Sequence, residues 1–134
     1  MNRGIGMDPK SKILLVEDDI PSAMRFTAIL TAAGYELQVE RTGTRGLEKA
    51  CARKFDLIIL DVDSPQVDGL AINVELKQRH ISYRTPLVFL SDHLSIEDQQ
   101  RALALGINDV FHKNLSRDEL IFRIASLLEA TTAV

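Results

Sequence analysis

The residues best suited to chemistry stand directly after short apolar runs of this sequence. Residues 17–19 read Glu-Asp-Asp and residues 61–63 read Asp-Val-Asp, while Ser91 and Lys113 stand at the ends of two further runs. Two carboxylates about 4 Å apart repel each other by about 4 kcal/mol at an effective dielectric constant near 20. A divalent cation relieves that repulsion, and Mg2+ prefers one or two carboxylates together with water and phosphate oxygens. The set therefore indicates phosphoryl chemistry supported by a hard metal ion.

Each of these residues has a plainer explanation when it is taken alone. Asp19 and Asp92 are typical of helix N-caps, because an aspartate side chain accepts hydrogen bonds from the first free backbone N–H groups of a helix. A lone lysine such as Lys113 is usually a solvated surface charge, and Ser91 is a common turn residue. All four run ends carry a group that phosphoryl transfer needs, and this combination is rare among residues that serve only as caps, turns or surface charges. We therefore treat the set as one candidate site.

Five apolar runs are the elements that must position this site. They are rich in Ile, Leu and Val, and four of them lack the polar alternation of a strand with one solvated face. We therefore expect strands, mostly covered on both faces, over residues 13–16, 37–39, 57–60, 86–90 and 109–112.

Segments with helical spacing of apolar residues separate these runs. In the last segment, one apolar stripe is formed by Leu120, Ile124, Leu127 and Leu128. Strands that alternate with helices predict an α/β fold, a doubly wound five-stranded parallel sheet with helices on both faces, because parallel strands need crossover helices. In such sheets ligands bind outside the carboxyl ends of the strands, where the candidate residues stand.

Length and composition set the wider expectations. The chain has 134 residues, 46% hydrophobic and 26% charged, which suits one globular domain. Its net charge of -3 gives the bulk surface no electrostatic reason to bind nucleic acid or an anionic membrane. No apolar run approaches the roughly 18 residues of a membrane span, and we expect a cytoplasmic location. The single cysteine, Cys51, excludes an internal disulfide, and its setting predicts a buried side chain.

Four separated motifs resemble the receiver domain of two-component response regulators, which has a flavodoxin-like fold. They are KILLVEDD at residues 12–19, DLIILDVDSPQVDGL at 56–70, PLVFLSD at 86–92 and GINDVFHK at 106–113. We accordingly expect a receiver domain over residues 12–130, between a loose tail at residues 1–11 and a short tail at residues 131–134. It is either a regulator by itself, without a DNA-binding output segment, or part of a larger regulator or hybrid kinase.

The resemblance implies a role for each motif residue. Asp61 is the expected phosphoacceptor, taking a phosphoryl group from a histidine kinase or phosphotransfer protein, without turnover of a substrate as in an enzyme. Asp18 is expected to coordinate Mg2+ directly and Glu17 through water, with Asp61 and the backbone carbonyl of Asp63 completing the protein ligands. Ser91 and Lys113 are then expected to bind the phosphoryl oxygens.

Three positions depart from the family pattern. Asn114 stands where the family usually has a proline after the lysine, often in a cis peptide, so the loop is expected to take another shape. Val110 replaces an aromatic switch residue, and the neighbouring Phe111 is expected to face the opposite side of its strand. Asp63 is unusual two residues after the phosphoacceptor. We hypothesise that Asp63 and His93 flank the phosphoryl group and alter its lifetime.

Two other functions use the same residues. Asp61 and Asp63 resemble the DxD motif of haloacid-dehalogenase-type phosphatases, although that motif belongs on the first strand of a longer chain. Alternatively, the altered residues Val110 and Asn114 are compatible with a receiver-like interaction module that does not use phosphate.

An output surface is expected where the family meets partners or a second copy. That surface is made by the fourth helix, the fifth strand and the fifth helix. Mixed charges are expected there from Arg101, Asp109, Glu119 and Arg123, beside the uncharged amide of Asn108. Such charges are compatible with a homodimer and equally with a solvated face.

Overall fold

The computed structural model describes residues 10–81 and 84–132, and within them the chain forms a five-stranded parallel sheet. The strand order is β2-β1-β3-β4-β5. The strands are β1 (Lys12–Val16), β2 (Glu36–Glu40), β3 (Leu57–Asp61), β4 (Leu87–Leu90) and β5 (Asp109–Phe111). The helices are α1 (Ile20–Ala32), α2 (Gly43–Ala52), α3 (Gly69–Gln78), α4 (Ile96–Ala104) and α5 (Arg117–Thr132).

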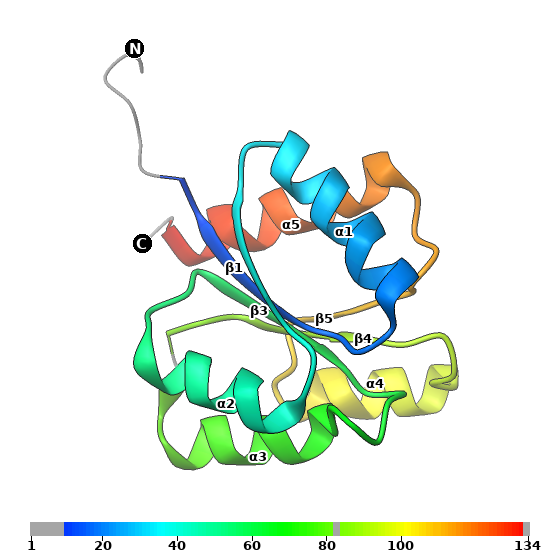
Figure 1. Ribbon diagram of the computed structural model, residues 1–134. Coiled ribbons are helices and arrows are strands. Elements are labelled where there is room, and N and C mark those ends of the chain that lie inside the picture. The colour runs from blue at the N-terminus through cyan, green and yellow to red at the C-terminus, as the bar shows by residue number, and fades with distance from the viewer. Residues whose placement is uncertain (1–9, 82–83, 133–134) are drawn as a thin grey trace.

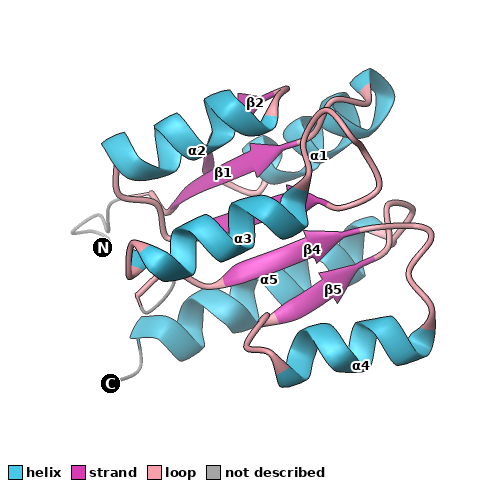
Figure 2. Ribbon diagram, turned by 90° about the horizontal axis from the view of Figure 1, so that it is seen from below, coloured by secondary structure: helices cyan, strands magenta, loops and turns pink. Residues whose placement is uncertain are grey.

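Helices cover both faces of the sheet, as the sequence predicts. Helices α1 and α5 lie on one face, and α2, α3 and α4 lie on the other (Figure 1). All neighbouring strands pair in parallel, so their arrowheads point to the same edge (Figure 2). The doubly wound α/β fold is therefore confirmed, and the loops that follow β1, β3, β4 and β5 share one edge.

Strand residues alternate between two apolar cores, which explains why the runs lack polar positions. Ile13 and Leu15 of β1 pack in the core that contains Phe26 of α1. Leu14 and Val16 pack in the other core, on the side of α2 and α3. These four side chains are fully buried, whereas Lys12 at the start of the strand is exposed. A strand between two helix layers therefore needs apolar residues at consecutive positions.

Side-chain caps begin the helices close to the site. Asp19 caps α1, accepting a hydrogen bond from the Ser22 N–H at 3.0 Å, as predicted. Helix α4 is capped by Ser95, whose hydroxyl accepts from the Asp98 N–H at 3.1 Å. The expectation that Asp92 is a cap was therefore wrong. Its carboxylate instead accepts a hydrogen bond from the Lys113 N–H at 2.8 Å, because the loop after β4 turns it toward β5.

Gly69 allows the start of α3 to pack against the end of β3. A Cβ atom at this position would lie 2.7 Å from the backbone oxygen of Asp61, which is too close for any side chain. Asp68 precedes it in the left-handed conformation, with φ of 51°, and caps the helix through the Ala71 N–H. The Asp-Gly pair thus fixes how α3 leaves the carboxyl edge.

Two expectations about single side chains had different outcomes. Phe111 is fully buried beside α1 and α5 while Val110 packs on the opposite core, so the predicted alternation in β5 is confirmed. Cys51 is exposed, and the prediction that it is buried was wrong. The segment 50–52 ends α2, and its apolar spacing places Ala50 rather than Cys51 against the sheet.

The predicted domain boundaries fall partly outside the described residues. Residues 1–9 of the expected N-terminal tail and residues 133–134 of the expected C-terminal tail are not described. Helix α5 continues through Thr132, two residues into the segment expected as the C-terminal tail.

Candidate functional site

Carboxylates from the loops after β1 and β3 meet at the carboxyl edge of the sheet. Glu17, Asp18 and Asp61 each offer one oxygen, and these three atoms all lie within 4.8 Å of one another. Lys113 reaches them from the loop after β5, with its Nζ 3.3 Å from Asp61 Oδ2 and 3.2 Å from Glu17 Oε1. Parallel strands bring together residues that are 52 positions apart in the sequence.

The ionisable groups of this site are largely shielded from solvent. The side chains of Glu17 and Asp61 are fully buried, and that of Lys113 is 15% exposed. Desolvation, followed by the hydrogen-bonded contact with Asp61, raises the pKa of Glu17 to about 8. Burial by itself lowers the pKa of the Lys113 ammonium, but Asp61 and Glu17 together outweigh it and raise that pKa. The Lys113 ammonium therefore lies beside two carboxyl groups, of which Glu17 holds its proton more tightly than an exposed glutamate does.

The same carboxylates fit a divalent cation. Glu17 Oε1 is a buried oxygen without a well-oriented hydrogen bond among the described residues, although the Lys113 ammonium lies close to it. Glu17 Oε2 accepts a hydrogen bond from the Asp19 N–H at 3.1 Å, which leaves Oε1 turned toward the other carboxylates. A hard cation prefers clustered oxygens of this kind, and it would relieve both the repulsion and the unmet hydrogen bond.

The Ser91 hydroxyl is hydrogen-bonded to Asp63, the acidic residue two positions after the end of β3. This hydroxyl donates a hydrogen bond to Asp63 Oδ1 at 2.5 Å and accepts from the backbone N–H groups of His93 and Leu94. Asp63 in turn donates its N–H to Asp61 Oδ1 at 2.8 Å. Asp63 is therefore bonded both to Asp61 and to Ser91, the residue that the family resemblance predicts to bind a phosphoryl group on Asp61. The sequence singled out Asp63 as unusual but did not predict its bond to Ser91.

The backbone of Lys113 is hydrogen-bonded at both its N–H and its carbonyl group. Asp92 accepts the Lys113 N–H, and the Arg25 guanidinium of α1 donates to Lys113 O at 3.2 Å and to Leu115 O at 2.6 Å. No described peptide bond is cis, so the loop before Asn114 differs from the usual family form. The sequence did not predict a role for Arg25, because an arginine on an amphipathic helix is usually a solvated surface charge.

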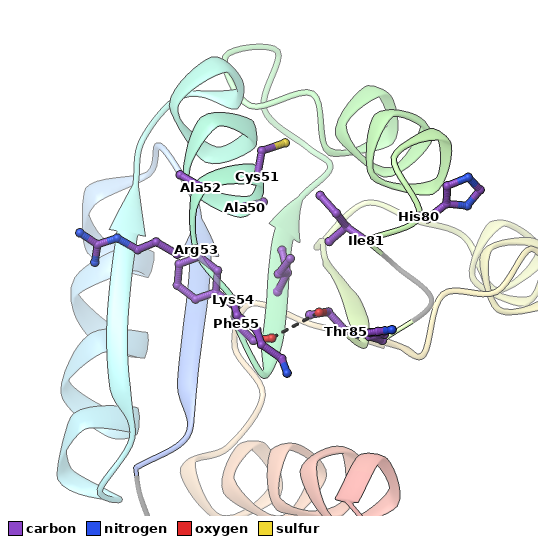
Figure 3. A pocket seen from close by; sticks show the side chains of 11 residues that line it. Ala50, Cys51, Ala52, Arg53, Lys54, Phe55, His80, Ile81 and Thr85 are labelled. Atoms are coloured by element: carbon purple, nitrogen blue, oxygen red, sulfur yellow. Dashed lines mark hydrogen bonds between the residues drawn. The ribbon is translucent and has the colours of Figure 1, made fainter.

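A cavity of about 650 Å³ lies at the opposite edge of the sheet, far from the acidic cluster. Figure 3 shows its lining side chains at the end of α2 and in the segments leading into β3 and β4. Phe55 and Thr85 are joined there by a hydrogen bond from the threonine hydroxyl to the Phe55 carbonyl. The cavity shares no lining residue with the acidic cluster, and we assign it no part in the chemistry of that cluster.

The described helices were compared with the length and hydropathy of membrane-spanning helices. Among residues 10–81 and 84–132, no helix combines the length and the apolar character that crossing a bilayer requires.

Fold and site together define a class of protein, a doubly wound α/β domain with an acidic site at the carboxyl edge of its sheet. Within this class, residues 13–125 match the response regulator receiver domain family, and the chain belongs to that family. Members of the family are signalling proteins, and the expected family is confirmed.

Relatives and solved structures agree with this assignment. The transcriptional regulatory protein RprY of Bacteroides fragilis is 34% identical over 92% of this chain and 52% of its own length. The transcriptional activator protein IrlR of Burkholderia pseudomallei is 35% identical over 87% of this chain and 50% of its own. The chain thus spans about half the length of these curated relatives.

A solved receiver domain with a metal ion provides a structural comparison. The receiver domain of a sensor histidine kinase from Pseudomonas aeruginosa has a TM-score of 0.80 and 26% identity, covering 90% of this chain and 98% of its own. That structure contains a magnesium ion coordinated in its active-site cleft.

Proposed function

We propose that this receiver domain is phosphorylated on Asp61 by a histidine kinase or phosphotransfer protein. One observation carries the proposal: the buried Asp61 carboxylate shares the Lys113 ammonium with Glu17 in a cluster that fits a divalent cation. An Asp61 oxygen forms the new bond to phosphorus, the bond from phosphorus to the donor imidazole nitrogen breaks, and that nitrogen keeps the electron pair. The product is an aspartyl phosphate.

Mg2+ is the proposed cofactor, held by Asp18 and Asp61 directly, by Glu17 through water and by the Asp63 carbonyl. When bound, the ion offsets negative charge on the phosphoryl oxygens. The Lys113 ammonium binds a phosphoryl oxygen from the other side, 3.3 Å from Asp61 Oδ2 in the unphosphorylated protein. The comparison with a magnesium-bound receiver domain supports the choice of ion.

Ser91 is the proposed sensor of the phosphoryl group. Its hydroxyl is a donor that can exchange an acceptor on Asp63 for one on the phosphoryl group. Because the new contact exists only after phosphorylation, it favours a second arrangement of the loop after β4. Val110 has no ring to follow this movement, so the signal passes through the loop itself.

A groove beside the site is the proposed docking place of the kinase or phosphotransfer protein. Helix α1 begins directly after Asp19, and its exposed residues Ile20 and Met24 line an apolar groove together with Val39. As residues, Ile20 and Met24 are 51% and 67% exposed. A phosphohistidine can reach Asp61 only if its carrier contacts the edge of the sheet, and this apolar surface lies at that edge.

A homodimer through α4, β5 and α5 remains the proposed output state. Arg123 pairs with Glu119 at 2.9 Å and with Asp109 at 3.4 Å, and it can exchange these partners for those of a second copy. The exposed Leu103 and Phe122 add apolar area on α4 and α5. Sedimentation at increasing concentration, with and without beryllofluoride, would detect such a dimer, whereas a monomer throughout would exclude it.

Incubation with acetyl phosphate and Mg2+ tests the proposed phosphorylation. Mass spectrometry should detect one added phosphoryl group in the parent and none in Asp61→Asn. An Asp61→Asn variant that is still labelled would place the phosphoryl group elsewhere. An unlabelled parent would favour an interaction module without phosphate, and repeated turnover of a phosphate ester would favour the phosphatase alternative.

A further inference from the structure

Asp63 joins two consecutive positions of the loop after β4 to the loop after β3. Its Oδ1 accepts the Ser91 hydroxyl at 2.5 Å, and its Oδ2 accepts the Asp92 N–H at 2.9 Å. The Asp63 side chain is 15% exposed, and Ser91 is 4% exposed as a residue. Hydrogen bonds to a carboxylate at such partly buried positions are stronger than those between neutral groups.

These two contacts occupy the groups that phosphorylation requires. The Ser91 hydroxyl has one proton, and it can donate this proton either to Asp63 or to a phosphoryl oxygen. The hydroxyl oxygen already accepts from the N–H groups of His93 and Leu94. Movement of Ser91 toward Asp61 therefore requires the bond to Asp63 to break.

We infer that Asp63 is a latch that holds the loop after β4 in its unphosphorylated arrangement and competes with the phosphoryl group for Ser91. This inference rests on the proposed phosphorylation of Asp61. A phosphoryl group on Asp61 brings negative charge beside the Asp63 carboxylate, since the Asp63 N–H already contacts Asp61 Oδ1 at 2.8 Å. Phosphorylation thus repels the latch and attracts Ser91 at the same time.

Asp92 extends the effect of the latch to Lys113. The backbone of Asp92 is bound by Asp63, and its carboxylate binds the N–H of Lys113 at 2.8 Å. Three loops of the carboxyl edge are therefore linked in series through Asp63 and Asp92. Release of Asp63 frees the loop that sets the backbone position of Lys113.

A double-mutant cycle with beryllofluoride and Mg2+ tests the latch. Beryllofluoride affinity is measured for the parent, Asp63→Ala, Ser91→Ala and the double variant, with Glu97→Gln as a control that removes an exposed charge from α4. Asp63→Ala should bind about tenfold more tightly than the parent when Ser91 is present, because a competing charged hydrogen bond is lost. In the Ser91→Ala background, the gain in beryllofluoride affinity from Asp63→Ala should be smaller. Only the repulsion between the Asp63 carboxylate and beryllofluoride is then removed.

The possible results separate the latch from the proposed function. An equal gain in both backgrounds, or no gain, overturns the latch while leaving phosphorylation of Asp61 intact. No beryllofluoride binding by the folded parent overturns the proposed function and the latch with it. If Asp63→Ala does not fold, Asp63→Leu replaces it, because leucine has a similar shape and no acceptor. Faster amide exchange at Asp92 then reports loss of the latch, whereas unchanged exchange contradicts it.

Discussion

Arg25 and Lys113 stand 88 positions apart in the sequence, yet the Arg25 guanidinium donates a hydrogen bond to the Lys113 carbonyl at 3.2 Å. The same guanidinium binds Leu115 O at 2.6 Å, so α1 holds the loop that presents the Lys113 ammonium to Asp61. In this chain, therefore, the loop is shaped by a side chain from another element and not by a cis proline.

Replacing Arg25 should consequently weaken the site without touching its charged groups. We expect Arg25→Ala to slow phosphorylation of Asp61 by acetyl phosphate severalfold, because Lys113 loses its fixed backbone. Arg25→Lys should recover little, since one ammonium does not reproduce two guanidinium bonds. Arg45→Ala removes an exposed arginine from α2 as a control. Rates equal to those of the parent would show that Asp92 alone positions the loop.

Stability should depend on pH through Glu17 in protein that is free of metal. The pKa of Glu17 is about 8 in the folded state, above its ordinary value of 4.5. The folded protein therefore binds a proton more tightly than the unfolded chain, and the free energy of unfolding should fall as pH rises between these values. Chemical denaturation of the parent and Glu17→Gln in EDTA should show a steeper fall for the parent.

Added Mg2+ should reverse this loss at the upper end of the pH window. The cation favours the ionised Glu17, so stabilisation by Mg2+ should be larger at pH 8 than at pH 5. An equal Mg2+ effect at both pH values would mean that Glu17 does not take part in binding the ion.

The lifetime of the phosphoryl group should depend on Asp63. Once released from Ser91, its carboxylate can accept a proton from the attacking water, so Asp63→Asn should slow dephosphorylation, severalfold or more. The decay of the phosphorylated protein, measured by mass spectrometry, checks this prediction, with Glu97→Gln as the control. Equal rates in Asp63→Asn and the parent would eliminate a role of Asp63 in hydrolysis.

Gly69 should tolerate no side chain. A Cβ atom there would meet the Asp61 carbonyl at 2.7 Å, so Gly69→Ala must displace either α3 or the end of β3. We expect a loss of about 1–3 kcal/mol in the free energy of unfolding, together with slower phosphorylation. Urea denaturation measures the first effect. A stable variant with parental kinetics would show that the strand and helix separate easily.

The apolar groove on α1 should matter for protein donors alone. We expect Met24→Ser to slow phosphotransfer from a histidine kinase or phosphotransfer protein, while acetyl phosphate labels it at the parental rate. Acetyl phosphate needs no docking surface, which makes it the internal control. A parallel loss with both donors would indicate damage to the site and not to docking.

The sequence by itself determined the architecture and the members of the acidic cluster. Consecutive apolar residues in β1 and β3 can be buried only between two helix layers, and parallel pairing then sends Glu17, Asp18 and Asp61 to one edge. Lys113 was likewise predicted from its motif, and its Nζ lies 3.3 Å from Asp61 Oδ2. These features follow from local periodicity and strand direction, which a sequence records directly.

Only the tertiary structure decided which of these groups bind one another. The bond from Ser91 to Asp63, the turn of Asp92 toward Lys113 and the reach of Arg25 across to the last loop depend on loop conformations. Such contacts join residues that are distant in the chain, and their geometry changes with small rotations of backbone and side chains. Residue types and spacing are compatible with several such arrangements, and packing of the whole domain selects one.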